Sequence, residues 1–539
     1  MNRCDTHRCV RSATILIGLL TLSLSVMWGV SQAAAGAKTV LVLGTDISDT
    51  NSLDPQRQFV YSAPITEHAI YETLITMTPG NYKDVKPLLA TTWETVENGA
   101  ALVFHLRPNV KFVTGNPLTA DDVKFTFERL KYLKDDASAL AENIARVDVI
   151  DPLTVKVVLV DKTQPLLPFL IAPNFGIVDS KIVKQQGGLS TPDADKNDKA
   201  TAFLDQRSVG TGPYTLTRWS RSTEIELVRN PGYWRQPAAF ERVLIRHIPD
   251  SATQVLQLKR GDIDAALNLT FDQLNSLRGM SGINVVKGQS LDFMYVAITS
   301  SPALSQPLGN KLARQALMHA IDYDGIIKGL IGGDAIRPAS FIPVGLGGST
   351  TDLTREIGYH QDLDKAKALL AQAGFPNGFA FDLSYGSGAD VGGVSYEVVA
   401  QKLQADLARV KIQANLKPME QGNLRTAYRK GDLAATITFW NPDAMDASLW
   451  ADPTVQRVAK RVRWEPDAAA VSLAKQAAGE LNPQKRDGLY VQFQKLLMDQ
   501  ANLCVLFQPV YSHAIRDGIT GYQLTAAGWQ VDLYDIKPR

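Results

Sequence analysis

The sequence has 539 residues, 45% of them hydrophobic, so it is too long for a single core and predicts two or three subdomains. Its 56 Lys and Arg residues almost balance 55 Asp and Glu residues, which leaves a formal net charge of +1. Without a strongly basic stripe, the composition argues against nucleic acid as a partner.

The first residues have the order of a secretory leader. Three arginines precede an uncharged apolar segment from Ala13 to Val30, and small residues follow from Ser31 to Ala37. This order predicts a signal peptide over about residues 1–35, cut after Ala33, Ala35 or Ala37, and therefore a periplasmic protein. A retained membrane anchor is the alternative, because the apolar segment is nearly long enough to span a bilayer.

The cysteines agree with a soluble exported chain. Cys4 and Cys9 precede the apolar segment, so neither lies where a lipoprotein carries its acylated cysteine. The mature chain would keep only Cys504, which rules out an intrachain disulfide in it and is expected to be a buried small hydrophobe.

The first half of the chain is expected to mix strands and helices. Strands are predicted at Thr39–Gly44, Ala101–Val110 with its turn, Thr154–Val160, Ile225–Arg229 and Val243–Ile248, and helices at Ile65–Thr76, after a capping box at Thr119–Asp122, and at Thr253–Lys259. The polar segment Gly187–Arg207 is predicted to be a surface excursion. Gly210 and Gly212 make a tight turn and lack the spacing of a phosphate loop.

The second half predicts an alternating α/β pattern. Strands are expected at Phe293–Ile298, Phe379–Tyr385, Ile412–Leu416, Ala434–Trp440 and Leu503–Phe507, and helices at Leu312–Ala320, from Asp322, at Leu363–Ala373, at Tyr396–Val410 and at Gly488–Asp499. Such alternation indicates a sheet with helices on its faces.

The strand Ala434–Trp440 is the candidate functional centre. It stops at Asn441, which a proline follows, and opens into a turn with Asp443 and Asp446, so two carboxylates and the indoles of Trp440 and Trp450 can face a cleft. An ordinary surface turn with solvated aspartates is the alternative. Phe59 and Tyr61 lie in a loop before the first predicted helix and can approach the same cleft or simply anchor the loop.

Ten segments in order resemble the oligopeptide, dipeptide and nickel-type solute-binding proteins of ABC importers, known as family 5. They are Ser52–Pro55, Tyr71–Ile75, Pro87–Glu94, Phe104–Phe112, Gly115–Val123, Gly210–Tyr214, Asn230–Trp234, Arg260–Asp264, Leu312–Asp322 and Asp362–Phe375. The resemblance implies an α/β fold of two lobes joined by a hinge, with an extra N-terminal subdomain. Lobe I would cover 36–295, lobe II 296–500, and 501–539 would return to lobe I.

The resemblance also implies roles for the turn. In peptide-binding relatives a tryptophan lies on the cleft wall, and an aspartate three positions later pairs with the peptide amino terminus, a spacing that Trp440 and Asp443 reproduce. Asp446 falls where relatives often have an Asp-Pro pair, although Ala447 replaces the proline. The expected ligand-binding residues are Asp443, Trp440, Asn441, Asp446, Tyr61 and Phe59.

One departure bears on the ligand. Dipeptide-type members hold the peptide carboxylate with an arginine after the strand corresponding to Phe379–Tyr385, whereas Gly386–Ser395 contains no basic residue. The chain could therefore bind longer peptides through backbone pairing, or a non-peptide solute such as a sugar conjugate, an opine-like compound or a chelated metal.

The expected function is a monomeric periplasmic component that delivers a peptide or peptide-like solute to an ABC permease and its ATPase. An enzyme is disfavoured by the lack of a GxSxG or HExxH motif, and no cofactor or metal site is expected. His105 is expected to be structural. A secreted hydrolase or chaperone on the same fold is the remaining alternative.

Overall fold

A large mixed sheet joins the two halves of the chain. The computed structural model describes residues 38–539 apart from 80, 389, 392, 441–444 and 528, and Lys38–Arg539 forms one compact unit. The main path of the sheet is β18 (Gln413–Met419), β15 (Ala380–Gly386), β19 (Ala435–Trp440), β13 (Phe293–Ile298), β20 (Leu503–Arg516), β11 (Ala265–Ala266), β1 (Val40–Thr45), β10 (Arg242–His247), β9 (Glu224–Arg229) and β8 (Tyr214–Ser220).

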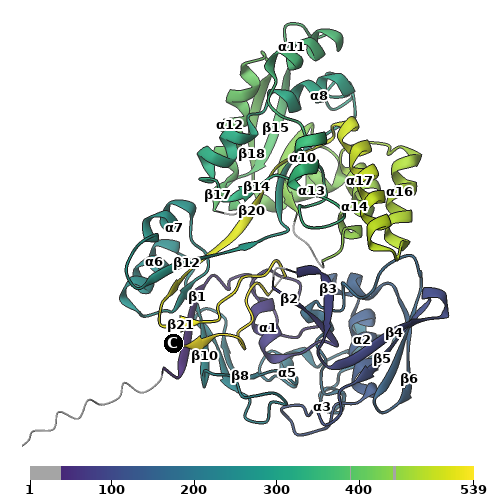
Figure 1. Cartoon of the computed structure of the whole chain (residues 1–539), viewed down its shortest axis with the longest axis vertical. Coiled ribbons are helices and arrows are strands. Elements are labelled where there is room, and N and C mark those ends of the chain that lie inside the picture. Colours follow the sequence, from purple (N-terminus) through teal and green to yellow (C-terminus); the bar gives the residue numbers. More distant parts are fainter. Residues whose placement is uncertain (1–37, 80, 389, 392, 441–444, 528) are drawn as a thin grey trace, which may run out of the picture. The chain divides into compact units, whose positions relative to one another are not determined.

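The long strand β20 connects the strands of the first half with those of the second. Its start pairs with β13, where Phe507 lies opposite Met294. Its end pairs with β11 and with β12 (Ile283–Gln289), and its middle also pairs with β14 (Ala335–Ile336). Figure 1 shows it as the yellow strand that runs between the two groups of strands. The predicted strand Leu503–Phe507 was too short, because polar residues interrupt the apolar pattern after it while the backbone pairing continues.

A four-stranded antiparallel sheet forms an extra subdomain in the first half. Its order is β4 (Ala90–Val96), β5 (Ala101–Leu106), β7 (Thr154–Leu159) and β6 (Ile144–Asp151). Helix α2 (Ala120–Leu133) packs on it through the buried Val123, Phe127 and Leu130. The predicted capping box is confirmed, since the Thr119 N–H donates to the Asp122 carboxylate at 2.9 Å.

Helix α1 (Pro64–Ile70) is shorter than the helix predicted at Ile65–Thr76. Tyr71 is already extended, and the hairpin β2 (Ile75–Thr78) and β3 (Asn81–Pro87) follows. The reason is the predicted glycine turn, which packs against the chain here. A Cβ on Gly210 would lie 2.1 Å from the carbonyl oxygen of Ile70, so only glycine allows this approach, and tertiary packing overrides the helical pattern.

The prediction that Gly187–Arg207 is a surface excursion was wrong in part. The segment contains α4 (Ala194–Asn197) and α5 (Thr201–Leu204), and the Asp198 side chain is fully buried. Arg129 of α2 contacts Asp54 at 2.6 Å and Asp198 at 2.9 Å. Burial alone would lower the pKa of Arg129, but these carboxylates outweigh it and raise the pKa.

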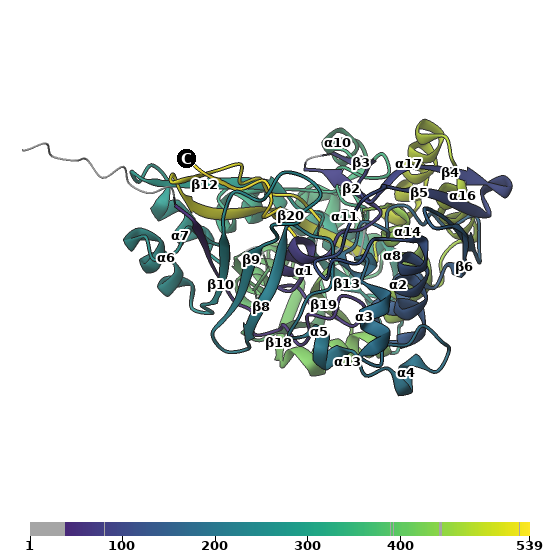
Figure 2. The same ribbon diagram turned by 90° about the horizontal axis from the view of Figure 1, so that it is seen from below.

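Helices cover the strands of the second half. They include α8 (Lys311–Ala320), α11 (Leu363–Gln372), α12 (Tyr396–Ala408), α13 (Gln421–Lys430), α14 (Ser448–Pro453), α16 (Ala468–Gly479) and α17 (Pro483–Gln500). The pattern predicted α8, α11 and α12 correctly, and α12 buries Val399, Leu403 and Leu407 as expected. Figure 1 shows α12 beside β15 and β18, and Figure 2 shows the same elements from below. Helix α12 contacts both strands, which confirms the α/β arrangement.

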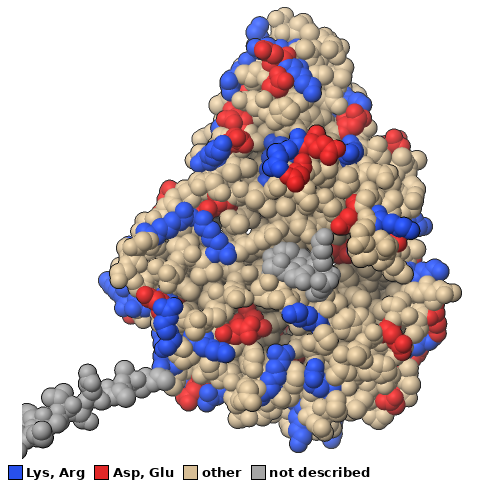
Figure 3. Space-filling model, in the orientation of Figure 1, with Lys and Arg blue, Asp and Glu red and all other residues tan. Residues whose placement is uncertain are grey.

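Among the remaining helices of the first half, α3 (Ser180–Gln185) contacts α2. Helix α6 (Ser251–Arg260) contacts β11 and β20, and α7 (Phe271–Leu277) contacts β12 and β20. Cys504 is buried, as predicted. On the face drawn in Figure 3, Lys and Arg are interspersed with Asp and Glu, in keeping with the balanced composition. Within the described part of the chain, no helix is long and apolar enough to cross a membrane.

Candidate functional site

Trp440 ends β19 and packs on two buried aromatic residues, Phe341 and Phe293. The strand pairs antiparallel with β13, so Trp440 lies opposite Phe293. Its ring meets the edge of Phe341, with centroids 5.4 Å apart, and Phe341 packs in turn on Phe293 at 4.9 Å. Phe293 and Phe341 are buried, whereas Trp440 is only partly so. These two residues therefore hold the indole in place while part of it stays open to a ligand, as an apolar wall requires.

The turn after Trp440 holds three further predicted site residues. Asn441 and Asp443 lie outside the described residues. Asp446 is buried, and its two carboxylate oxygens accept hydrogen bonds from Arg486 of α17, both at 2.7 Å. Asp446 also accepts from the N–H of Ser448 at 2.9 Å. These bonds fix the entry into α14, so the geometry supports a positioning role for Asp446, and its direct contact with a ligand stays a prediction.

Phe59 and Tyr61 lie in the loop before α1, as predicted, and both are exposed, by 39% and 51%. The Tyr61 N–H donates to Asp49 at 2.9 Å, and its hydroxyl accepts from Gln530. Burial of the hydroxyl group, and then the negative charge of Asp292, raise the pKa of Tyr61. Tyr61 therefore has an anchored hydroxyl and an accessible ring, which suits a residue that closes over a ligand.

The structure adds Asp292, which sequence reasoning missed. It directly precedes β13 and is 7% exposed. The hydroxyl of Tyr511, on β20, donates to its Oδ2 at 2.8 Å, while Oδ1 is buried and has no hydrogen-bond partner among the described residues. Burial raises the pKa of Asp292 to about 7, although the Tyr511 bond opposes the shift. A lone aspartate before a strand carries no motif that could have revealed it.

Tyr511 links the predicted residues of the two halves. Its hydroxyl interacts with that of Tyr61 as well as with Asp292. Asp292 is the chain neighbour of Phe293, which supports Trp440. The loop residue Tyr61 is thus linked through Tyr511 to Asp292, whose chain neighbour Phe293 pairs with Trp440.

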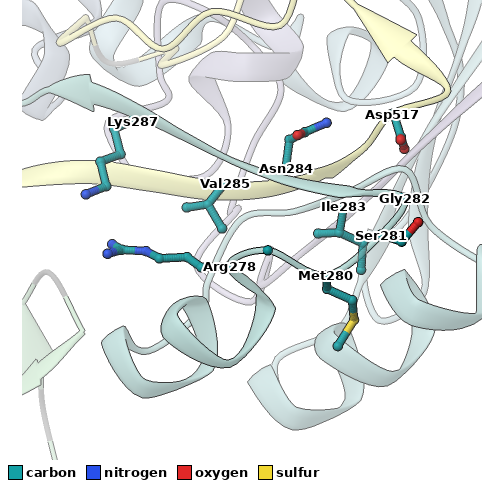
Figure 4. Close-up of a pocket in the computed structure, with 10 residues that line it drawn as sticks. Arg278, Met280, Ser281, Gly282, Ile283, Asn284, Val285, Lys287 and Asp517 are labelled. Carbon is teal, nitrogen blue, oxygen red and sulfur yellow. The ribbon is translucent and has the colours of Figure 1, made fainter.

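Two hollows lie elsewhere on the described surface. The larger, of about 620 Å³, lies between the end of α7, β12 and Asp517 (Figure 4). Its Arg278 and Lys287 both pair with Asp334, so their charges are already compensated. The second, of about 230 Å³, lies by α1, the β2–β3 hairpin and the C-terminal segment. Of the predicted site residues, the four that the structure describes, Phe59, Tyr61, Trp440 and Asp446, line neither hollow.

Metal ligands do not gather in the part of the chain that the structure describes. No group of three or more His, Cys, Asp and Glu side chains there is placed to hold an ion. His105 is about half exposed on β5, with only a 3.5 Å contact to Thr154 and a 4.0 Å approach to Glu94.

Residues 84–457 match the model of the bacterial extracellular solute-binding proteins, family 5. The chain is 29% identical to the probable D,D-dipeptide-binding periplasmic protein DdpA of Escherichia coli K12, over 95% of this chain and 96% of that protein. The structure resembles the periplasmic binding protein DppA of Helicobacter pylori, solved with the peptide STSA, with 24% identity, a TM-score of 0.74, and coverage of 93% of this chain and 98% of that one.

A second solved structure resembles the chain at a similar level. This is AgaA of A. tumefaciens R10 in complex with agropinic acid, with 22% identity, a TM-score of 0.71, and coverage of 93% of this chain and 99% of that one. These likenesses confirm the α/β fold of the two-lobed periplasmic binding proteins. The chain belongs to the bacterial extracellular solute-binding proteins of family 5.

Proposed function

We propose that this protein captures a peptide or peptide-like solute between two lobes and delivers it to an ABC permease and its ATPase at the inner membrane. The observation that carries the proposal is the partly exposed indole of Trp440, which packs on Phe341 at the end of β19. Relatives named for dipeptide binding support the peptide class.

The chemistry of the site suits a peptide. Trp440 and Tyr61 offer apolar ring faces for peptide planes and side chains, and Phe59 adds a third aromatic ring in the loop. Asp443 is the proposed receptor for the amino terminus, through a charge-assisted hydrogen bond. Asn441 is the proposed neighbouring polar contact. Asp446, held by Arg486, would position this turn.

The proposed lobes follow the pairing of the large sheet. Strands β1 and β8 to β11 precede residue 295, while β15, β18 and β19 fall within 296–500. Segment 501–539 contains β20, which pairs with strands from both groups and supports the proposed return to lobe I. Strand β13 crosses the proposed boundary. Binding of a solute is expected to draw the lobes together by hinge bending.

The proposal also covers the export of the protein, its oligomeric state and the absence of a catalytic role. Residues 1–35 act as a cleaved signal peptide, so the mature protein is periplasmic. It works as a monomer, without a cofactor and without a catalytic role, because its task is to hold and release a solute.

A non-peptide solute is the second candidate, and one specific observation favours it. The family member AgaA was solved with agropinic acid on the same fold, and Gly386–Ser395 offers no arginine for a peptide carboxylate. An opine-like compound, a sugar conjugate or a chelated metal would use the same aromatic wall.

Mass spectrometry of the purified mature protein after mild denaturation tests the proposal. Release of peptides, in an amount comparable with the protein, is the expected result. Release of a single non-peptide compound would contradict the peptide class and support the second candidate. Urea-washed and refolded protein serves as the ligand-free control.

A further inference from the structure

Asp292 is a buried carboxylate, and only one of its two oxygens accepts a hydrogen bond from a described residue. Tyr511 occupies Oδ2 at 2.8 Å, and Oδ1 has no hydrogen-bond partner among the described residues. Buried carboxylate oxygens are nearly always paired, because an unpaired one loses its hydration without replacement. An orphan oxygen at this position therefore needs an explanation that the fold itself does not provide.

None of the described residues that interact with Asp292 carries a positive charge. The groups that face it are the hydroxyls of Tyr511 on β20 and of Tyr61 in the loop before α1. Asp49, in the same loop, binds the Tyr61 N–H and adds another negative charge. The buried His513, further along β20, bonds to Tyr522 instead. The electrostatic environment thus favours an incoming positive group.

Asp292 is joined on two sides to residues of the proposed ligand site. Asp292 precedes Phe293, which lies opposite Trp440 in the β13–β19 pair. On its other side, Tyr511 connects it to Tyr61, whose ring is half exposed. Asp292 is therefore linked, through its chain neighbour Phe293 and through Tyr511, to both aromatic residues that the proposed function assigns to the solute.

We infer that Asp292 is a second acidic receptor in the solute site, and that the preferred solutes are peptides with a basic side chain. This inference rests on the proposed function. Asp443 is assigned to the amino terminus, whereas Oδ1 of Asp292 receives an ammonium or guanidinium group of the side chain. Tyr511 is a positioning residue, because it holds Oδ2 and leaves Oδ1 free.

A proton would leave as the basic group arrives. The raised pKa of about 7 means that Asp292 is largely neutral in mildly acidic solution. A bound cation stabilises the ionised form, lowers the pKa and displaces the proton to solvent. Affinity for a basic peptide should therefore increase as the pH rises toward 7, and the gain should vanish without the Asp292 carboxyl group.

Matched tripeptides test the inference on the mature protein. The probes are Ala-Lys-Ala, Ala-norleucine-Ala and Ala-Glu-Ala, with the same substitutions also placed at the last position, measured by titration calorimetry. We expect the best lysine peptide to bind about tenfold or more tightly than its norleucine counterpart, as for a buried hydrogen bond to a charged group. Asp292→Asn should abolish that preference, and Asp535→Asn, at another carboxyl with a raised pKa, should keep it.

Proton release supplies a readout that does not depend on a variant folding. Titrations at about pH 6 in two buffers of different ionisation enthalpy should show about one proton released per bound lysine peptide, and none for the norleucine peptide. Tyr511→Phe should reduce the lysine preference and change the pH profile.

Each outcome separates the two proposals. Binding of peptides without a lysine preference, or with no proton release, would overturn the role of Asp292 and leave the peptide proposal standing. A lysine preference that persists in folded Asp292→Asn would overturn it as well. If none of the tripeptides binds, the peptide proposal is contradicted and the inference falls with it.

Discussion

Asp446 and Arg486 form a two-point ion pair, with both nitrogen–oxygen distances at 2.7 Å, that joins the turn after β19 to α17. The Asp446 side chain is 5% exposed and that of Arg486 is 23% exposed. The pair therefore holds the proposed ligand-binding turn on a rigid helix from a largely desolvated position.

Arg486→Met should destabilise the protein markedly. It would leave Asp446 buried and uncompensated near Asp452, whose pKa is already raised to about 6 by burial and by Asp446. Breaking such a pair typically costs about 3 kcal/mol of the free energy of unfolding, to be measured by urea denaturation. Lys495→Met, on the same helix but in an exposed pair with Glu356, is the control and should change it by about 1 kcal/mol at most. Equal stability of the two variants would contradict this role.

Arg129→Met should be more damaging, because the guanidinium is fully buried between Asp54 and Asp198. We expect a loss of about 3 to 5 kcal/mol in urea unfolding, or failure to accumulate folded protein. Arg218→Met removes an arginine that is 53% exposed and should be close to neutral. A mild effect of Arg129→Met would show that 187–207 is the solvated excursion that its composition suggests.

The pH dependence of stability should carry a contribution from Asp292. Its pKa is about 7 in the folded protein and near 3.8 when unfolded, so the folded state binds more protons between these values. The contribution is present below about pH 4 and is lost as the pH rises through about 7. Asp292→Asn should remove it and should gain stability relative to the wild type at alkaline pH.

His513 acts in the opposite direction and has to be separated in that experiment. Burial lowers the pKa of His513 to about 4, so its contribution is lost as the pH falls from about 6.5 toward 4. The difference between wild type and Asp292→Asn, from urea unfolding across the pH range, cancels the His513 contribution. A difference that does not vary with pH would contradict the assignment.

Local patterns predicted the elements that local sequence controls. The capping box at Thr119 and the apolar face of α12 are examples, and both are confirmed. Helix α1 was predicted too long because its end is set by Gly210, far along the chain. No helical or strand periodicity encodes such an approach.

The candidate site could be predicted only where one segment carries it. The strand that ends at Trp440 was predicted because the apolar run and the following proline are adjacent in sequence. Asp292 was missed because it becomes significant only beside Tyr511, 219 residues later. The pairing of Asp446 with Arg486, 40 residues apart, was missed for the same reason.

The proposed signal peptide predicts a defined mature end. The secreted protein should begin between Ala34 and Lys38, because cleavage is expected after a small residue of this stretch. Intact mass of the exported protein measures this end. Membrane-bound material that retains Met1 would show that the apolar segment is an anchor.

Titration calorimetry with the co-purified solute tests the central claim, that the end of β19 binds the solute, most directly. The experiment compares wild type with Asp443→Asn and Trp440→Ala, using Asp535→Asn as the control and circular dichroism to verify folding. Loss of a buried charged contact costs about 2 to 5 kcal/mol, so Asp443→Asn should weaken binding about 30-fold or more. Trp440→Ala should also weaken it, because the apolar wall is removed. Less than about threefold weakening in both folded variants would contradict the site assigned to Trp440 and Asp443.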